Sequence, residues 1–128
     1  MDGHIDERTD EHMGEVIDLT ALAREAIVSG KAGPLWSLSS ADLNANVLRF
    51  AAGDGVPEHV NSEVDVVMLV VSGAAVVTLD GQDLPVHGGQ LVVLPKGARR
   101  AIRAEGGEVV YVTVHRRRMG LMPTRKQS

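Results

Sequence analysis

Apolar and polar residues follow two different patterns along the chain. Near the N-terminus, five apolar residues recur at helical spacing: Leu19, Leu22, Ala23, Ala26 and Ile27. Asp18 suits the N-cap of such a helix and Gly30 suits its end, so we expect one short helix over about 18–29. Its apolar side has to cover another surface, most simply one face of a sheet.

After Pro34 the pattern changes to that of strands. Apolar and β-branched runs recur at 43–50, 64–71, 74–79, 90–94, 98–103 and 109–115, and the segments between them are rich in glycine. Asp80-Gly81 is typical of a tight hairpin turn. Short strands at this spacing predict an all-β sandwich or barrel. The run 64–71 is apolar on both sides apart from Asp65, so we expect both of its faces to be covered.

Four polar residues follow one another at every second position before that apolar run. If the chain is extended from His59, the side chains of His59, Asn61, Glu63 and Asp65 share one face. Polar groups that enter a barrel must be hydrogen-bonded, ligated or hydrated. We therefore expect a small-molecule site there.

The glycines around this stretch have a regular spacing. Gly53 is followed after five residues by His59 and Asn61; Asp65 comes after three more residues, and Gly73 after a further seven. A second block has Gly89, five residues, and then the sequence 95–100, Pro-Lys-Gly-Ala-Arg-Arg. The hairpin 73–89 separates the two blocks.

Both blocks resemble the two sequence motifs of the cupin superfamily, which are rich in glycine and histidine. The resemblance covers residues 53 to about 104 and implies a cupin-type double-stranded β-helix, a jelly-roll barrel. In cupins, two histidines and a glutamate of the first motif and a histidine of the second bind a divalent metal. His59 matches the first histidine, whereas Asn61 and Arg100 stand where the other two are expected. Asp65 matches the glutamate only if one extra residue precedes Gly73.

This set of residues is poor in metal ligands. Arginine stays protonated in proteins and repels a cation, so we expect no standard, tightly bound metal and no other cofactor. If a divalent metal is bound, the candidate ligands are His59, Asp65 and His115. By strand alternation His115 shares a face with Tyr111 and Thr113, so it is a candidate for pointing into the barrel.

Arg100 suggests a second interpretation of the same positions. Across the barrel from His59 and Asn61, its guanidinium could form a planar fork for a carboxylate or phosphate on a ligand, with Glu63 and Asp65 completing the site. Alternatively, Arg100 forms an internal ion pair with Asp65 or Glu63 and needs no ligand. The sequence leaves both open.

Length and composition limit the number of domains and the kinds of site that the chain can form. The 128 residues suffice for one domain, which we place at 15–116, with the helix at about 18–29 and the barrel at about 34–116. We expect a disordered acidic tail at 1–14 and a basic tail at 117–128. The absence of cysteine excludes thiolate sites and disulfides, and 2% aromatic residues disfavour stacking on nucleic acid.

Three functions remain open at this level. The first is a barrel that binds a small, anionic organic molecule without a standard metal. The second is a metal-dependent cupin enzyme, an isomerase or dioxygenase with an atypical site, so the sequence does not decide whether a reaction occurs. The third is a structural or regulatory interaction module. In each case we expect a cytoplasmic homodimer that has no nucleic-acid or membrane partner.

Overall fold

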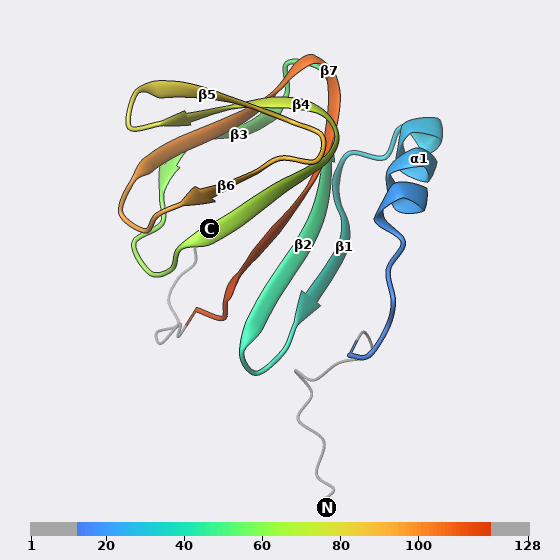
Figure 1. The fold of residues 1–128 in the computed structure, drawn as a ribbon, viewed down its shortest axis with the longest axis horizontal. Helices are drawn as coiled ribbons and strands as arrows, with labels where there is room; N and C mark the ends of the chain where they lie inside the picture. The colour runs from blue at the N-terminus through green and yellow to red at the C-terminus, as the bar shows by residue number, and fades with distance from the viewer. Residues whose placement is uncertain (1–12, 119–128) are drawn as a thin grey trace, which may run out of the picture.

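The chain folds into two facing β-sheets that share two long, bent strands (Figure 1). The computed structural model describes residues 13–118, so most of each tail expected from the sequence lies outside the described residues. The elements, in chain order, are α1 (Leu19–Ser29), β1 (Gly33–Ser39), β2 (Leu43–Phe50), β3 (Gly55–Val60), β4 (Val66–Leu79), β5 (Gln82–His87), β6 (Leu91–Leu94) and β7 (Arg99–Arg116). The all-β jelly-roll expected from the sequence is confirmed.

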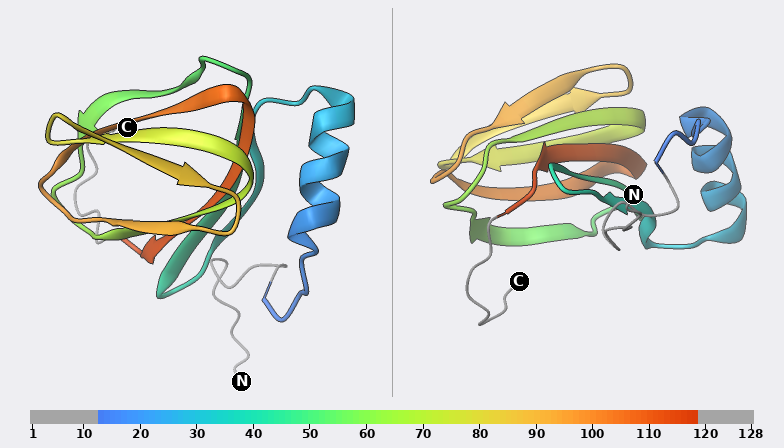
Figure 2. Two further views of the ribbon diagram at one scale, coloured as in Figure 1. Left: turned by 45° about the horizontal axis from the view of Figure 1, so that its top comes forward. Right: turned by 90° about the horizontal axis from the view of Figure 1, so that it is seen from below.

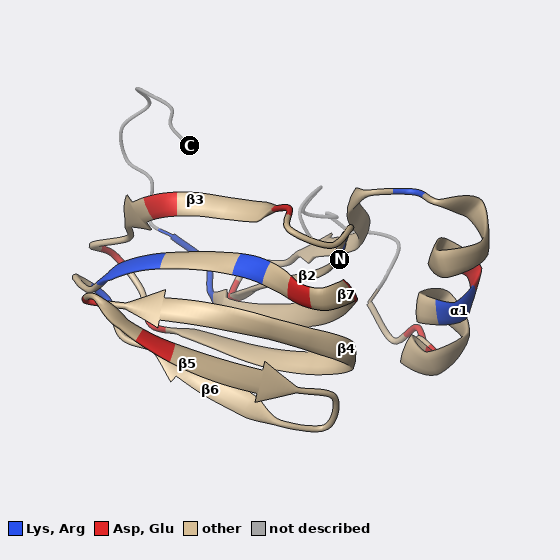
Figure 3. Ribbon diagram, turned by 90° about the horizontal axis from the view of Figure 1, so that it is seen from above, with Lys and Arg blue, Asp and Glu red and all other residues tan. Residues whose placement is uncertain are grey.

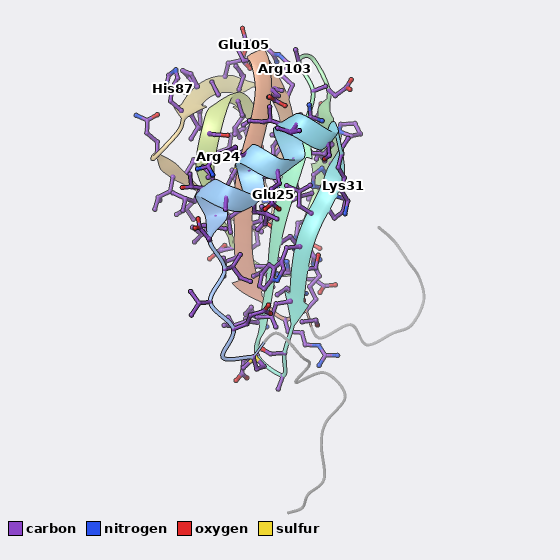
Figure 4. The ribbon with its side chains drawn as sticks, turned by 90° about the vertical axis from the view of Figure 1, so that its right-hand side faces the viewer. Arg24, Glu25, Lys31, His87, Arg103 and Glu105 are labelled. Carbon is purple, nitrogen blue, oxygen red and sulfur yellow. The ribbon has the colours of Figure 1, made fainter. Side chains whose placement is uncertain are left out.

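The helix α1 begins and ends where the sequence predicts. The Asp18 carboxylate accepts a hydrogen bond from the backbone N–H of Ala21 (3.0 Å), and Gly30 ends the helix in the left-handed conformation. The helix lies against the outside of the barrel (Figure 2). Figure 4 looks onto this side of the molecule, where α1 lies in front of the strands. Within residues 13–118, no helix is long and apolar enough to cross a membrane.

The contact between α1 and the barrel is apolar. Buried Ala23 packs with Val47 of β2 and Val110 of β7, and Trp36 of β1 joins the same cluster. At one end the connection to β1 is held by Arg49, which forms an ion pair with Glu108 (2.6 Å) and donates to the carbonyl oxygens of Gly30 and Lys31. The helix therefore covers part of one outer face and leaves the interior of the barrel to the strands.

The two long strands β4 and β7 are V-shaped. The first arm of β7 pairs with β3 and with residues 75–79 of β4, whereas its second arm pairs with β2 and with residues 67–73 of β4. The bends coincide with Gly73 and Gly106, both at positive φ (78° and 77°), and with register shifts in the ladder. The sequence predicted two strands in place of each V, and that prediction is wrong because the glycines bend the strands without interrupting the pairing.

The main core lies between the arms of these strands. It includes Met68 and Val70 of β4 and Tyr111 of β7, all fully buried, and the ring of Tyr111 stacks on that of Phe50 (6.2 Å between centroids). The expectation that both faces of 64–71 are covered holds only in part. Val71 packs near the helix, but Val67 is 39% exposed.

We predict that Gly73→Ala destabilises the fold more than Gly81→Ala does. Both glycines have positive φ, which costs an alanine about 1–2 kcal/mol. A Cβ at position 81 meets open space, whereas a Cβ at position 73 overlaps the backbone carbonyl oxygen of Glu108, so the β4 bend has to shift. Urea unfolding of both variants measures the difference. Equal losses would show that the bend adapts without cost.

Candidate functional site

A cavity of about 330 Å³ opens between the arms of β7. It is within the size range of small-molecule sites. Its apolar wall consists of Leu48, Val56, Val66, Leu94, Ile102 and Tyr111. Its polar wall consists of Asn46, His59, Arg100, Thr113, His115 and Arg118. No acidic residue is among the described residues that line it.

Strand register brings the polar side chains together. Asn46 of β2 lies opposite Thr113 of β7, and His59 of β3 lies opposite Arg100 on the other arm of β7. Alternation along β7 places Thr113 and His115 on the same face. Figure 3 shows β3 alongside β7, with basic positions in blue. Arg100 is therefore a lateral neighbour of His59, and the sequence-based expectation that it lies across the barrel from His59 is wrong.

Arg100 is the most unusual residue of the cavity. Its side chain is only 3% exposed, and its one hydrogen bond within residues 13–118 goes from Nη1 to the Leu94 carbonyl at a long 3.4 Å. No carboxylate of the described residues forms an ion pair with it. Burial lowers the pKa of Arg100 below its ordinary value, and the positive charge of Arg118 lowers this pKa further.

The two histidines are held in the same way. Nδ1 of His115 lies 2.8 Å from the Arg116 carbonyl oxygen, and Nδ1 of His59 lies 2.9 Å from that of Pro57. A carbonyl oxygen only accepts, so in each neutral ring Nδ1 carries the proton and Nε2 is the free acceptor. Burial lowers the pKa of His115; the hydrogen bond to Arg116 opposes this shift, and the charges of Arg118 and Arg100 reinforce it.

Three of the residues expected to bind a ligand lie outside the cavity lining. β3 ends at Val60, so the chain is not extended through Asn61, Glu63 and Asp65. The reason is Asn61 itself: its buried Oδ1 accepts the N–H groups of Glu63 and Val64 (2.9 and 3.3 Å) and turns the chain. The prediction that positions 59, 61, 65 and 100 line one hollow is therefore wrong for Asn61 and Asp65.

The internal ion pair expected for Arg100 is absent from the described residues. The Asp65 carboxylate is exposed and accepts from the backbone N–H of Lys96 (2.8 Å), which joins the 61–65 loop to the loop before β7. Glu63 is also exposed. Neither carboxylate compensates the buried guanidinium.

Sequence reasoning missed Asn46 and Arg118. Asn46 accepts a hydrogen bond at Oδ1 from the Ser37 hydroxyl (2.8 Å), which leaves its amide N–H groups for the cavity. A signal was present, because Asn44 and Asn46 share the face of Leu48 and Phe50 within one strand. Arg118 follows the last strand, where no strand alternation predicts the direction of a side chain.

A second hollow, of about 370 Å³, lies beside the 53–57 loop, between that loop and the outward side of β4 and β7. Its charged groups are Asp54 and Arg103, and Arg103 contacts Glu105 at 3.6 Å. These groups are exposed or paired, whereas the inner cavity holds a buried charge that has no counter-charge in the described part of the chain. We therefore take the inner cavity as the candidate site.

The residues of the cavity do not fit a transition-metal centre. Two imidazoles, His59 and His115, offer Nε2, but none of the described lining residues is a carboxylate, and two arginines, Arg100 and Arg118, line the same cavity. Across the part of the chain that the structure describes, no three His, Asp or Glu side chains cluster closely enough to hold a metal ion. Asp65, one of the ligands suggested by the sequence, is tied to Lys96 outside the cavity.

Two facing sheets joined by bent strands, with a ligand-sized cavity between them, define a small jelly-roll barrel. The family model described as "Cupin domain" matches residues 46–115, more than half of the chain, and the chain therefore belongs to the cupin family. No curated protein matches the sequence.

Solved structures show the same fold at low sequence identity. A double-stranded β-helix protein from Klebsiella pneumoniae has a TM-score of 0.68 at 17% identity, over 84% of this chain and 88% of that one. A protein from Thermus thermophilus has a TM-score of 0.65 at 23% identity, over 80% and 96%. KdgF from Halomonas sp. has a TM-score of 0.61 at 22% identity, over 66% and 78%. At these identities the likeness shows the fold alone.

We predict that Arg100→His creates a metal site. The substitution removes the repelling cation and adds a third imidazole next to His59, so zinc binding is expected to rise to about one ion per chain. Metal content after dialysis against zinc measures it, in the unaltered protein and in the variant. Arg99→His is the matched control, since Arg99 is the exposed neighbour that pairs with Glu58. Equal zinc content in all three proteins would show that positions 59, 100 and 115 do not converge.

We also predict that His115 makes the fold less stable in acid. Because burial lowers its folded-state pKa, the unfolded chain binds a proton below about pH 6.5 that the folded chain resists. The free energy of unfolding therefore falls as pH is lowered from 7 to 5, and His115→Gln is expected to reduce that fall. Urea titrations at both pH values measure it, with the exposed His87→Gln as control. If the free energy of unfolding falls equally in both variants, the pH dependence does not come from His115.

Proposed function

We propose that this cupin binds a small, anionic organic molecule in the cavity between its sheets, with Arg100 as the anchor and without a transition metal. The observation that supports this is the buried guanidinium, which has no carboxylate partner among residues 13–118 and faces a cavity without acidic lining. Asn46 and Thr113 supply further polar groups on the opposite arm of the same cavity.

The energetic argument concerns an uncompensated charge. Removing a cation from water costs several kcal/mol unless ion pairs and hydrogen bonds replace the hydration. Of the five N–H donors of Arg100, one is used in a long hydrogen bond. A carboxylate in the cavity would receive two parallel hydrogen bonds from this fork and would also reduce the repulsion between Arg100 and Arg118.

The other functions considered have less support. A metal-dependent isomerase or dioxygenase needs a ligand set that the cavity residues do not provide. A purely structural module would not require a buried arginine with free donors. A homodimer and a cytoplasmic location stay predictions, as does the absence of nucleic-acid and membrane partners.

We predict that Arg100→Leu abolishes anion binding and leaves the barrel folded. A panel of organic acids screened by thermal shift should contain members that raise the Tm of the unaltered protein, because they bind only its folded state. None should raise the Tm of Arg100→Leu. The variant without ligand should be as stable as the original or more stable by roughly 1–4 kcal/mol, as found when buried ions are replaced by apolar side chains.

Arg99→Leu is the matched control. Arg99 is adjacent in β7 but points outward to Glu58 (3.2 Å), so this variant should keep the response to acids. The proposal is wrong if Arg100→Leu still responds to the same acids, or if no acid shifts the unaltered protein at millimolar concentration.

A further inference from the structure

The cavity changes from polar to apolar with depth. At the open end of the V formed by β7, the paired positions are Asn46 with Thr113 and His59 with Arg100. One step further in, Leu48 pairs with Tyr111 and Val56 with Ile102. These two layers follow from strand register, and the second contains no charged residue.

Buried core residues close the inner end of the apolar layer. Tyr111 is 1% exposed, and its ring stacks on Phe50, the next inward residue of β2. Val109 and Ala104, at the bend of β7, are buried and belong to the same core. A molecule in the cavity therefore meets hydrocarbon on its inner side and charge on its outer side.

The charge of the cavity also limits the ligand. Arg100 is the buried cation; Arg118, the other arginine of the lining, is exposed. The single buried fork of Arg100 matches one carboxylate, whereas the second negative charge of a phosphate dianion would have to rely on the exposed, hydrated Arg118 or be desolvated next to Leu94 and Ile102.

We propose, building on the anion-binding function above, that the ligand is an amphipathic monocarboxylate. Its carboxylate binds the fork of Arg100, and its apolar body lies in the layer formed by Leu48, Val56, Ile102 and Tyr111. Free organic acids with an alkyl or aryl body fit this description, and sugar phosphates do not.

Calorimetric titration with acetate, butyrate and hexanoate tests the proposal. Each added methylene that is buried in the apolar layer should lower the Kd about fourfold. Hexanamide, which has the same body without the charge, should bind at least roughly tenfold more weakly than hexanoate. Inorganic phosphate should bind no better than acetate.

Two variants locate the two ends of the ligand. In Arg100→Leu, hexanoate should bind no more tightly than hexanamide, whereas Arg99→Leu should still bind hexanoate more tightly than hexanamide. Val56→Thr keeps the shape of the side chain but replaces one methyl group by a hydroxyl, so it should weaken the binding of hexanoate and leave the affinity for acetate unchanged.

The outcomes separate the two proposals. If acetate and phosphate bind through Arg100 but longer acids bind no more tightly, the proposal of an amphipathic ligand is wrong and the proposal of anion binding stands. If hexanamide binds as well as hexanoate, the anion-binding function is wrong as well. Failure of every probe to bind would overturn both.

Discussion

A guanidinium that is shielded from water and has no counter-charge among residues 13–118 is the feature on which the character of this barrel depends. Arg100 occupies an inward position of β7, and its cross-strand neighbour is His59. Both strands are paired in the sheet, and Arg100 is 3% exposed. The barrel interior therefore carries a positive charge, and none of the described residues that line the cavity is acidic.

The same position explains how this chain differs from the metal-binding pattern of its family. Where the second cupin motif has a histidine, Arg100 places a cation, and Asn61 replaces a histidine of the first motif. In this chain the role of Asn61 is structural. Its side chain turns the chain after β3, so that positions 61–65 do not follow the cavity wall. Compared with that pattern, this chain keeps the barrel fold but has an asparagine in the turn after β3 and an arginine in the cavity.

The sequence predicted the helix and the all-β class from periodicity, capping residues and turn residues, and the resemblance of its two glycine-rich blocks to the cupin motifs implied the cupin fold. It also identified His59, Arg100 and His115, three of the polar residues of the cavity. It failed where a single side chain decides the local backbone: strand alternation assumed extended chain through Asn61, whose carboxamide oxygen accepts two backbone N–H groups instead. The V shape of β4 and β7 was also missed, since a glycine that bends a strand and one that ends it look alike in sequence.

One consequence of the V shape concerns how the width of the cavity is controlled. Arg100 and His115 belong to opposite arms of one strand, which bends at Gly106. From the bend to His115 the arm is about 30 Å long, so a rotation of about 2° there displaces its tip by roughly 1 Å. A small change of angle at the bend therefore changes the width of the cavity opening. Substitutions at the bend, which lies outside the cavity lining, are therefore expected to change the distance between the two arms.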